Sequence, residues 1–500
     1  MKRSMRRIGV VMMVMTLALM ANLTYIQVVK AVDYRHDPGN RRTVLEEYSR
    51  ARGQITAAGG VVLAQSVPSK DQYRYQRLYP GGAMYANITG YYSLRYGPTG
   101  LERLQNDLLS GNDPSLWVEQ LSDLITGRDP QGGNVQLTVV PAVQAAAYNG
   151  LASKGYVGAV VALQPSTGAI LAMASTPGFD PTLLASHAEA EQRNTYNKLV
   201  DESPSPMLDR SIGSVYPPGS TFKLVVTAAA LQHGFTPESV VTGAPIITLP
   251  GTGGATLSNY DKEACAGLGG RDVTLTQALA HSCNTAYATV AMDLGADVLK
   301  TEAALFGIGA DDSSIDGFPV AASRTGSMTA SNGKADQGAL AQSGIGQRDV
   351  ALTPMENAVI AATIANHGLR MQPYLVATTT RPDLTVIDQA EPKVLDQAVP
   401  AVVAQQIRDM MVASEKATPG SGHISGLTIA SKTGTAEHGT DPKATPPHAW
   451  YVAFAPADNP KVAVAVLVTN GGNRGLNATG ATVAGPIGRA VIAAALAGTQ

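Results

Sequence analysis

The chain has 500 residues, and its 37 Lys and Arg nearly balance its 39 Asp and Glu, which gives a formal net charge of −2. This balance excludes the strongly basic surface of a nucleic-acid-binding protein, so no nucleic-acid partner is expected, and the length favours two or three domains over a single core. A composition with 44% apolar residues, 51 Gly and only 2 Cys excludes a disordered chain, a disulfide scaffold and a protein with many membrane spans.

The N-terminal segment has the pattern of a membrane anchor. Residues 8–29 are uncharged and follow the basic residues Lys2, Arg3, Arg6 and Arg7. A helix of that length spans about 33 Å, which matches a bilayer core of about 30 Å. The basic residues predict a single-pass protein of the plasma membrane with its N-terminus in the cytoplasm and the rest of the chain outside. A cleaved signal peptide is the alternative, but Leu19 is a poor −3 residue for cleavage after Ala21, so we favour an uncleaved anchor over residues 1–32.

Two further regions follow the anchor. Residues 33–133 are polar and rich in Tyr and Arg, with short strand-like pieces such as 60–64. A stretch with Gly and Pro at 127–133 is typical of a linker. We therefore expect a small domain at 33–133 and a large domain at 134–500.

The large domain alternates strand and helix patterns. Its predicted strands are 159–163 and 169–173 in a hairpin near the start, and 427–435, 448–455 and 461–469 near the end. Residues 217–362 are mostly helix and loop, and an apolar helix is expected at 483–496. This order predicts an α+β fold, in which strands from both ends form one antiparallel sheet covered by helices, with a helical subdomain between them.

Three short motifs in the large domain point to chemistry. In chain order they are Ser220-Thr221-Phe222-Lys223, Ser282-Cys283-Asn284 and Lys432-Thr433-Gly434-Thr435. The patterns S-x-x-K, S-x-N and K-T-G occur together in serine acyl-transferases, a group that includes penicillin-binding proteins and class A β-lactamases. Additional copies at Ser331-Asn332-Gly333-Lys334 and Ser110-Gly111-Asn112 lie out of order or in the polar region, so we do not assign them to the site.

The spacing within each motif suits acyl transfer. Ser220 and Lys223 are three residues apart and share one face of a helix, so the amine is expected to reach the hydroxyl. The preceding Pro217-Pro218-Gly219 fits a helix start with free N–H groups beside the nucleophile. Lys223 must be neutral to accept a proton, and burial near Lys432 would lower its pKa. At the third motif, Gly434 is expected to let a substrate backbone approach closely, and the neighbouring hydroxyls to bind a carboxylate.

The three motifs resemble the active site of class B penicillin-binding proteins, and further blocks agree. Arg52-Gly53-Gln54-Ile55 is similar to the R-G-x-I box that follows the anchor in this class. Gly344-Ile345-Gly346-Gln347 with Leu352-Thr353-Pro354 resembles its I-G-Q and T-P blocks. Residues 437–442 and 448–456 look like the actinobacterial branch. The resemblance covers essentially the whole chain, although the small domain matches more loosely.

The resemblance implies a penicillin-binding transpeptidase/β-lactamase-like fold on a pedestal or dimerisation-like domain, and a peptidoglycan D,D-transpeptidase activity. Ser220 would attack the D-Ala-D-Ala carbonyl of a stem peptide, Lys223 would be the general base, and Ser282 would pass the proton to the leaving amine. Asn284 would hold the donor amide, and the N–H groups of Ser220 and Thr435 would form an oxyanion hole. The substrate carboxylate and backbone would be bound by Lys432, Thr433, Gly434 and Thr435. The implied partners are peptidoglycan stem peptides, β-lactam antibiotics and a membrane glycosyltransferase, with no cofactor and no metal.

The same motifs leave alternatives open. A D,D-carboxypeptidase would transfer the acyl group to water, and a scaffold of the cell-wall machinery would use the small domain for docking. A class A β-lactamase is disfavoured because Glu302-Ala303-Ala304-Leu305-Phe306 departs from E-x-x-L-N and comes too soon after S-x-N. Cys265 and Cys283 either form a disulfide that pins the second motif or remain buried thiols. The His and acidic residues within 437–448 are spaced too irregularly for a metal site.

Overall fold

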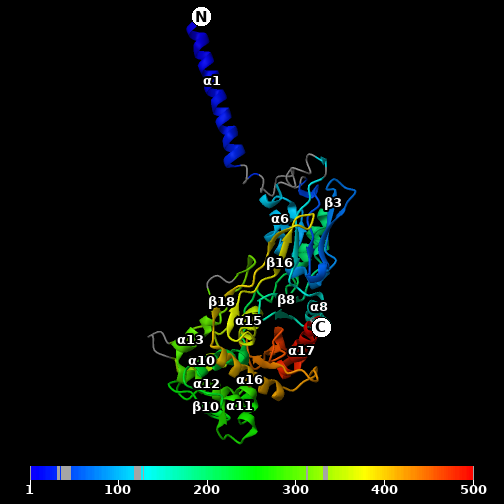
Figure 1. Cartoon of the computed structure of the whole chain (residues 1–500). Helices are drawn as coiled ribbons and strands as arrows, with labels where there is room; N and C mark the ends of the chain where they lie inside the picture. The colour runs from blue at the N-terminus through cyan, green and yellow to red at the C-terminus, as the bar shows by residue number, and fades with distance from the viewer. Residues whose placement is uncertain are drawn as a thin grey trace.

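The computed structural model describes residues 2–30, 34, 45, 47–117, 126–127, 129–310, 314–329 and 336–498. Figure 1 shows three parts along the molecule: an N-terminal helix that stands clear of the rest, a sheet-rich unit, and a larger unit of helices around a second sheet. We call the second part the pedestal and the third part the head. The C-terminus lies about midway along the molecule, beside the helices α8 (Pro141–Ala152) and α17 (Gly485–Ala497).

The N-terminal helix has the properties of a membrane anchor. Helix α1 (Lys2–Thr24) runs into a π-helical turn, η1 (Tyr25–Val29). The segment Met5–Val29 reaches a mean hydropathy of 1.8 and none of it is buried. Gly480–Ala497 also has the length and hydropathy of a membrane span, but 61% of it is buried and it holds the fully buried, ion-paired Arg489. That second segment is therefore a core helix of the head.

The pedestal is built on a six-stranded sheet with the order β17-β16-β6-β1-β2-β3. Its strands are β1 (Ile55–Thr56), β2 (Val62–Pro68), β3 (Tyr75–Leu78), β6 (Asn134–Leu137), β16 (Val376–Thr380) and β17 (Val386–Gln389). β6 runs parallel to β1, and the other neighbours are antiparallel. The expected boundary between residues 133 and 134 falls inside this sheet, because three of its strands come from the region assigned to the large domain. Pairing between such distant segments leaves no local pattern in a sequence.

The R-G-x-I box lies at the centre of the pedestal. Arg52 and Arg77 each donate from Nε to the carboxylate of Glu102, at 2.5 and 2.7 Å, and all three side chains are buried. Burial alone would raise the pKa of Glu102, but the two guanidinium groups outweigh it and hold that pKa below its usual value. A Cβ on Gly53 would lie 1.8 Å from the carbonyl oxygen of Gly133. The ion pair of Arg52 and the close packing at Gly53 thus explain why the R-G-x-I box has these two residues.

The head contains a five-stranded antiparallel sheet with the order β19-β20-β21-β7-β8. The strands are β7 (Gly158–Leu163), β8 (Ile170–Thr176), β19 (Ala430–Ala436), β20 (His448–Ala455) and β21 (Val462–Val468). Since β21 pairs with β7, strands from both ends of the large domain lie side by side, which confirms the predicted α+β architecture. Helices α8 and α17 pack on one face, and α10 (Lys223–Gln232) and α15 (Pro354–Ala365) lie on the other.

The helical subdomain occupies the end of the head that is far from the pedestal (Figure 1). Its helices are α11 (Leu275–Ala280), α12 (Asn284–Leu294), α13 (Ala296–Leu305), α14 (Gln337–Ser343) and α16 (Ala401–Ala417). The remaining short elements are α4 (Ala86–Thr89), α5 (Gly100–Leu104), α6 (Asn106–Ser110), β4 (Tyr92–Ser93), β5 (Gly97–Pro98), β9 (Val240–Val241), β10 (Ile246–Thr248), β11 (Thr256–Ser258), β12 (Val273–Thr274), β13 (Ser314–Ile315), β14 (Phe318–Pro319), β15 (Leu369–Met371) and β18 (Val394–Gln397).

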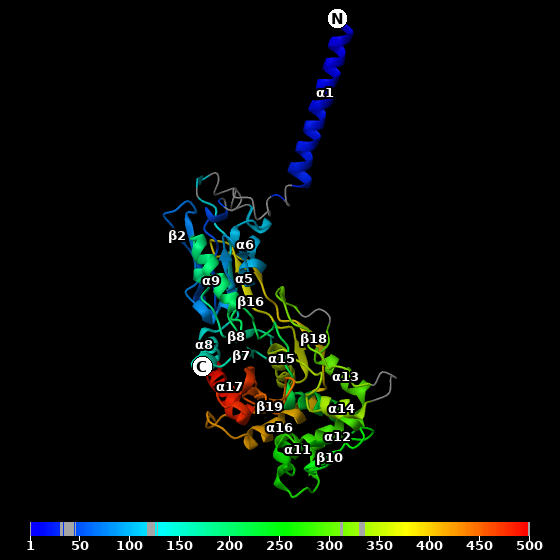
Figure 2. The ribbon, with the colours of Figure 1, turned by 180° about the vertical axis from the view of Figure 1, so that it is seen from behind.

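One further helix ties the chain after β8 back to the pedestal. Figure 2, the view from behind, shows α9 (Glu189–Asp201) against the pedestal. Gln192 of this helix is buried, and its Oε1 accepts a hydrogen bond from the Ser93 hydroxyl at 2.6 Å. The pedestal is therefore assembled from segments that come before β7 and after β8 in the sequence.

Candidate active site

The serine of the first motif lies in a tight turn. Ser220 belongs to a 3-10 turn, Gly219–Phe222, and α10 begins directly after it at Lys223. Gly219 has a φ of +55°, and its N–H donates to the carbonyl of Gly346 at 2.9 Å. Ser220 is half-buried, whereas Lys223 is fully buried. The sequence predicted this helix start, but the regular α-helix begins three residues after the serine.

Lys223 joins the first motif to the second. Its Nζ donates to the Ser282 carbonyl at 2.7 Å and to Asn284 Oδ1 at 2.9 Å, and it lies 3.4 Å from Ser282 Oγ. Burial, and then the charge of Lys432, lowers the pKa of Lys223 well below its ordinary value. The expected contact with the Ser220 hydroxyl is not among the hydrogen bonds of the described residues, because the amine is turned toward the second motif.

The Ser282 hydroxyl lies between two buried amines. Lys432 Nζ donates to Ser282 Oγ at 2.9 Å and to the Thr433 carbonyl at 2.8 Å. Burial lowers the pKa of Lys432 to about 7. Ser282 has a φ of +58°, a left-handed conformation that costs a residue with a side chain on the order of 1 kcal/mol. A hydroxyl held within reach of two amines of low pKa can pass a proton between groups.

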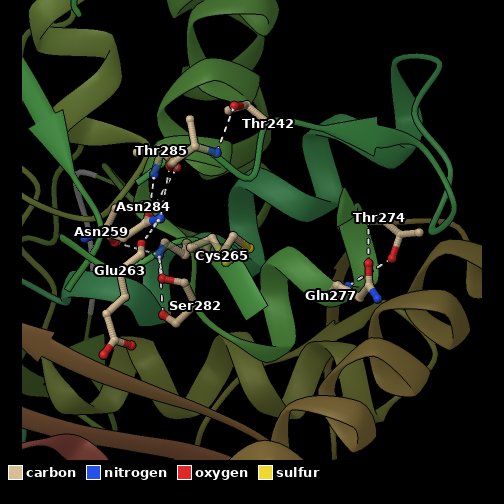
Figure 3. The surroundings of a disulfide bond; sticks show 12 residues. Thr242, Asn259, Glu263, Cys265, Thr274, Gln277, Ser282, Asn284 and Thr285 are labelled. Carbon is tan, nitrogen blue, oxygen red and sulfur yellow. Dashed lines mark hydrogen bonds between the residues drawn. A yellow bond between two sulfur atoms is a disulfide. The ribbon is translucent and has the colours of Figure 1, made fainter. Parts of the chain in front are cut away.

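A disulfide holds the second motif in place. Cys265 and Cys283 are bonded, with their Cα atoms 5.5 Å apart and a sequence separation of 18. Figure 3 shows Ser282 and Asn284 close to this bond. Asn284 is the first residue of α12, and its Nδ2 donates to the Ser258 carbonyl at 3.2 Å while its Oδ1 faces Lys223. Of the two states that the sequence left open for the cysteines, the structure contains the disulfide.

The third motif lies on β19, an edge strand that contacts the turn holding Ser220. A Cβ on Gly434 would lie 2.7 Å from the Pro218 carbonyl oxygen and 3.1 Å from Trp450 Cβ. A Cβ on Gly219 would lie 2.8 Å from the Thr435 carbonyl oxygen. A side chain at position 434 would thus clash with the turn before Ser220 and with Trp450, which by itself requires a glycine here. The expected close approach of a substrate backbone stays a prediction.

The free edge of β19 suits an extended peptide. Within the described residues, β20 is the only strand that pairs with β19. An edge strand presents N–H and C=O groups that a peptide can pair with. Thr433 and Thr435 are half-buried there, and the Lys432 amine lies beneath them. Hydroxyl and ammonium donors at one end of a strand favour a ligand that ends in a carboxylate.

Four rings that the sequence did not assign to the site lie against the same strands. Tyr216 makes edge-on contacts with His448 and Trp450, with ring centroids 5.5 and 6.5 Å apart, and His438 stacks on His448 at 3.7 Å. Burial, and then His438, lowers the pKa of His448 to about 3, so its ring is neutral. The Trp450 indole donates to the Pro217 carbonyl at 2.9 Å. The sequence pattern that could have revealed two of these rings is the alternation of side chains along a strand, which places residues 448 and 450 on one face of β20.

The other candidate positions lie away from this site. Ser110 ends helix α6 in the pedestal, where its hydroxyl accepts a hydrogen bond from Asn112 at 3.0 Å. Ser331 lies outside the described residues. In the part of the chain that the structure describes, no group of three or more His, Cys, Asp and Glu could hold a metal ion.

Comparison with protein families covers both units of the molecule. A model described as "Penicillin binding protein transpeptidase domain" matches residues 158–493, and one described as "Penicillin binding protein A dimerisation domain" matches residues 52–135. The chain belongs to the penicillin-binding protein family. The family that the three motifs indicated is thereby confirmed.

Relatives match this penicillin-binding protein along its full length. The peptidoglycan D,D-transpeptidase PbpA of Mycolicibacterium smegmatis is 51% identical over 99% of both chains, and that of Mycobacterium tuberculosis is 48% identical over 100% of both. A solved structure of penicillin-binding protein A from M. tuberculosis, a ceftriaxone acyl-enzyme complex, has a TM-score of 0.87 and 49% identity, and the match covers 90% of this chain and 100% of that chain. The penicillin G acyl-enzyme complex of the same protein has a TM-score of 0.84 at 48% identity over the same shares. The resemblance to the actinobacterial branch is confirmed.

Proposed function

We propose that this penicillin-binding protein is a peptidoglycan D,D-transpeptidase in which Ser220 carries the acyl group. The observation that carries the proposal is the position of the Ser282 hydroxyl, 2.9 Å from the Lys432 amine and 3.4 Å from the Lys223 amine, next to the turn that holds Ser220. A nucleophilic serine needs a base of lowered pKa, and burial gives Lys223, three residues after Ser220, such a pKa. The names of the full-length relatives support the same activity.

In the acylation step, Ser220 Oγ attacks the carbonyl carbon between the two D-Ala residues of a stem peptide. Neutral Lys223 takes the hydroxyl proton, and Ser282 passes a proton from the amine pair to the nitrogen of the departing D-Ala as the C–N bond breaks. The N–H groups of Ser220 and Thr435 are the proposed donors to the developing oxyanion, and one such donor contributes about 10²–10³-fold in rate. The products are an ester on Ser220 and free D-Ala.

In the transfer step, an amine of a neighbouring stem peptide attacks the ester carbonyl. The proton of that amine returns to the Ser220 oxygen through Lys223, and the new amide bond is the peptidoglycan cross-link. Attack by water would instead give D,D-carboxypeptidase activity. The relatives' name favours the amine as the acceptor.

The stem peptide ends in a carboxylate, which we assign to Lys432, Thr433 and Thr435 at the edge of β19. Gly434 stands between the two threonines, and Asn284 is assigned to the amide of the donor peptide. Because the free Lys432 has a pKa of about 7, a bound carboxylate favours its charged form and raises that pKa. The charge on Lys432 in turn holds Lys223 neutral, so substrate binding prepares the base.

β-Lactams carry a carboxylate and a reactive amide, so they can use the same groups. Ser220 attack on the lactam carbonyl opens the ring, and the leaving nitrogen stays attached to the acyl group. The solved M. tuberculosis protein is named as an acyl-enzyme complex with ceftriaxone, imipenem and penicillin G. We propose that β-lactams likewise acylate Ser220 of this chain.

The remaining parts of the chain receive matching roles. Residues 1–32 are assigned to a single-pass anchor in the plasma membrane, with the N-terminus in the cytoplasm and the head outside, on the strength of the basic residues before the apolar helix. Residues 33–133, together with β6, β16 and β17, are assigned to a dimerisation-like pedestal, and the rest of 134–500 to the transpeptidase domain. The family resemblance also implies a membrane glycosyltransferase that supplies the glycan strands.

The proposal is tested by incubation with a labelled penicillin, intact mass measurement and mapping of the adduct. We expect one adduct on the peptide that holds Ser220, no adduct in Ser220→Ala, and an unchanged adduct in the matched control Ser110→Ala. An adduct at Ser331, or none, would contradict the proposal. Complementation of a deletion strain separates the scaffold alternative, because a scaffold would still support growth when it carries Ser220→Ala.

A further inference from the structure

One segment of the head contacts both the turn that holds Ser220 and the end of β19. We call residues 344–354 the clamp segment; it contains the I-G-Q and T-P blocks, which have no role in the proposed acyl transfer. We propose that Gln347 of the clamp segment is a positioning residue that sets the separation of the two oxyanion-hole donors. The inference rests on the proposed function, since it concerns the N–H groups of Ser220 and Thr435.

The first contact of the clamp segment is with the nucleophile turn. The Gly346 carbonyl accepts a hydrogen bond from the Gly219 N–H at 2.9 Å. Gly346 has a φ of +70°, and a Cβ there would lie 2.0 Å from the Gly219 carbonyl oxygen and 2.9 Å from Phe222 Cβ. The two backbones are thus in direct contact one residue before Ser220, and no side chain at position 346 fits between them.

The second contact is made by the next residue and reaches the substrate strand. The orientation of the Gln347 amide is assigned from its partners: with Nε2 toward the Glu437 carbonyl and Oε1 toward the Glu437 N–H, it makes two hydrogen bonds of 3.1 Å, whereas the opposite orientation makes neither. One side-chain amide therefore satisfies both backbone groups of the residue that directly follows β19. Glu437 lies two residues beyond Thr435, so the strand is held immediately past the proposed donor.

The clamp segment is itself fixed at both ends. At its start, a Cβ on Gly344 would lie 2.3 Å from Ala291 Cβ of α12, so the segment packs closely on that helix. At its other end, Leu352 exchanges two backbone hydrogen bonds with Tyr216, both at 2.9 Å. A segment tied down in this way can transmit a fixed geometry through its side chains.

These contacts matter because the two proposed donors come from different elements. Ser220 lies in the turn before α10, whereas Thr435 lies on β19, and no ladder hydrogen bonds join the two. An oxyanion hole works only when both donor nitrogens lie about 2.7–3.1 Å from the position of the developing oxyanion, which is the length of a normal hydrogen bond. The two elements pack directly on each other at Gly434 and the Pro218 carbonyl. Gly346 and Gln347 hold them from adjacent positions, so the Gln347 amide fixes the end of β19 relative to the turn and thereby the separation of the two donors.

The test uses two variants that remove the Gln347 contacts in different ways. Gln347→Met keeps the length of the side chain and abolishes both hydrogen bonds. Gln347→Glu keeps the shape but sets a carboxylate oxygen against the Glu437 carbonyl. The matched control is Gln342→Glu, a charge change at an exposed glutamine five residues earlier in the chain. Acylation of the full-length protein by penicillin G is followed by stopped flow, which separates the prior binding constant from the acylation rate constant.

We expect the acylation rate constant to fall about 10–100-fold in both Gln347 variants, since a misplaced donor forfeits part of its effect on the transition state. The prior binding constant should stay within about threefold, and Gln342→Glu should change neither quantity by more than about twofold. Wild-type rates in Gln347→Met would overturn the proposal, and so would a loss confined to prior binding. If Gln347→Glu fails to fold, Gln347→Met decides the question.

A second readout does not depend on activity. In the wild-type protein, the Glu437 amide should exchange with deuterium at least tenfold more slowly than in Gln347→Met, because the hydrogen bond to Oε1 is lost in the variant. Equal exchange in the two proteins would overturn the inference. Absence of any wild-type acylation, with slow exchange at Glu437, would instead contradict the proposed function and leave the clamp geometry supported.

Discussion

The pedestal and the head each bury a cluster of charged side chains, and the two clusters are built in opposite ways. In the pedestal, Glu102 stands between Arg52 and Arg77, so a buried anion is matched by two cations that bond to it directly. In the head, Lys223 and Lys432 are both fully buried, and their hydrogen bonds go to hydroxyl, amide and carbonyl oxygens. The first cluster pairs its charges, whereas the second places two amines together with no anion bonded to either among the described residues.

This difference explains why one cluster is inert and the other is suited to chemistry. Pairing holds the pKa of Glu102 below its usual value, so its charge is fixed over the physiological range. Burial lowers the pKa of both lysines, to about 7 for Lys432, whose charge can therefore change near neutral pH, and for Lys223 the charge of Lys432 lowers it further. Removing the charge of Glu102 should therefore lower the stability of the pedestal. Replacing a buried lysine of the head by an apolar residue should not lower the stability of the head.

The largest expected effect is on catalysis in the head. Lys223→Met removes the proposed base and should lower the rate of acylation by a labelled penicillin about 10³-fold. The thermal midpoint of Lys223→Met should fall less than that of a variant that loses one partner of a buried ion pair. The reason is that an apolar side chain replaces a desolvated amine that has no anion bonded to it. Lys154→Met, at an exposed lysine, is the control and should leave the rate unchanged. Near-normal acylation in Lys223→Met would remove this lysine from the mechanism.

The matching change in the pedestal should affect stability instead. Glu102→Gln leaves two buried guanidinium groups without their anion and should cost about 3–5 kcal/mol of unfolding free energy, measured by denaturant titration. The folded fraction should acylate at the wild-type rate. Arg74→Ala breaks an exposed ion pair with Asp129 and serves as the control, with little or no change in stability expected. Equal effects of the two substitutions would contradict the contrast drawn between the clusters.

The next largest expected effect is that of removing the disulfide. Cys265→Ala with Cys283→Ala opens a loop of 18 residues and should cost about 3 kcal/mol in the chain-entropy model. Because Cys283 lies between Ser282 and Asn284, acylation should slow as well. Thiol titration of the denatured wild-type protein without reductant should find no reactive cysteine. Two reactive thiols would show that the bond is absent in the protein as prepared.

The smallest expected effect is a dependence of stability on pH. Lys432 has a pKa of about 7 when folded and an ordinary lysine pKa when unfolded, so between these values the unfolded state binds more protons. Stability should therefore rise with pH through this window, by about 1 kcal/mol from this group between pH 6 and 8. Lys432→Met should remove that increment from denaturant titrations at the two pH values, and Lys154→Met should retain it. A wild-type curve that is flat or falls over this range would contradict the burial of a neutral amine.

The sequence predicted the chemistry of the site better than its geometry. The three motifs extend over residues 220–435 and could be recognised because their residue types and order carry the signal, and the structure brings them to one place. The head sheet was predictable for a similar reason, since strands such as β7 and β21 are continuous apolar runs with turns beside them.

The missed features all depend on contacts between distant segments. Nothing in residues 376–380 marks them as a pedestal strand, because pairing with β6 is decided by tertiary structure. The packing reason for Gly434 was missed, since the sequence shows a small residue but not the Pro218 carbonyl that approaches it. The direction of the Lys223 amine likewise depends on oxygen atoms supplied by Ser282 and Asn284.

The return of β16 and β17 to the pedestal has a mechanical consequence. The chain enters the head after β6, leaves it again for these two strands, and then goes back, so several covalent connections cross the junction instead of a single flexible tether. A junction that several chain segments cross resists rotation about any one of these segments. The direction in which the active site faces relative to the pedestal is thereby built into the backbone, and the head would turn together with the pedestal as one body.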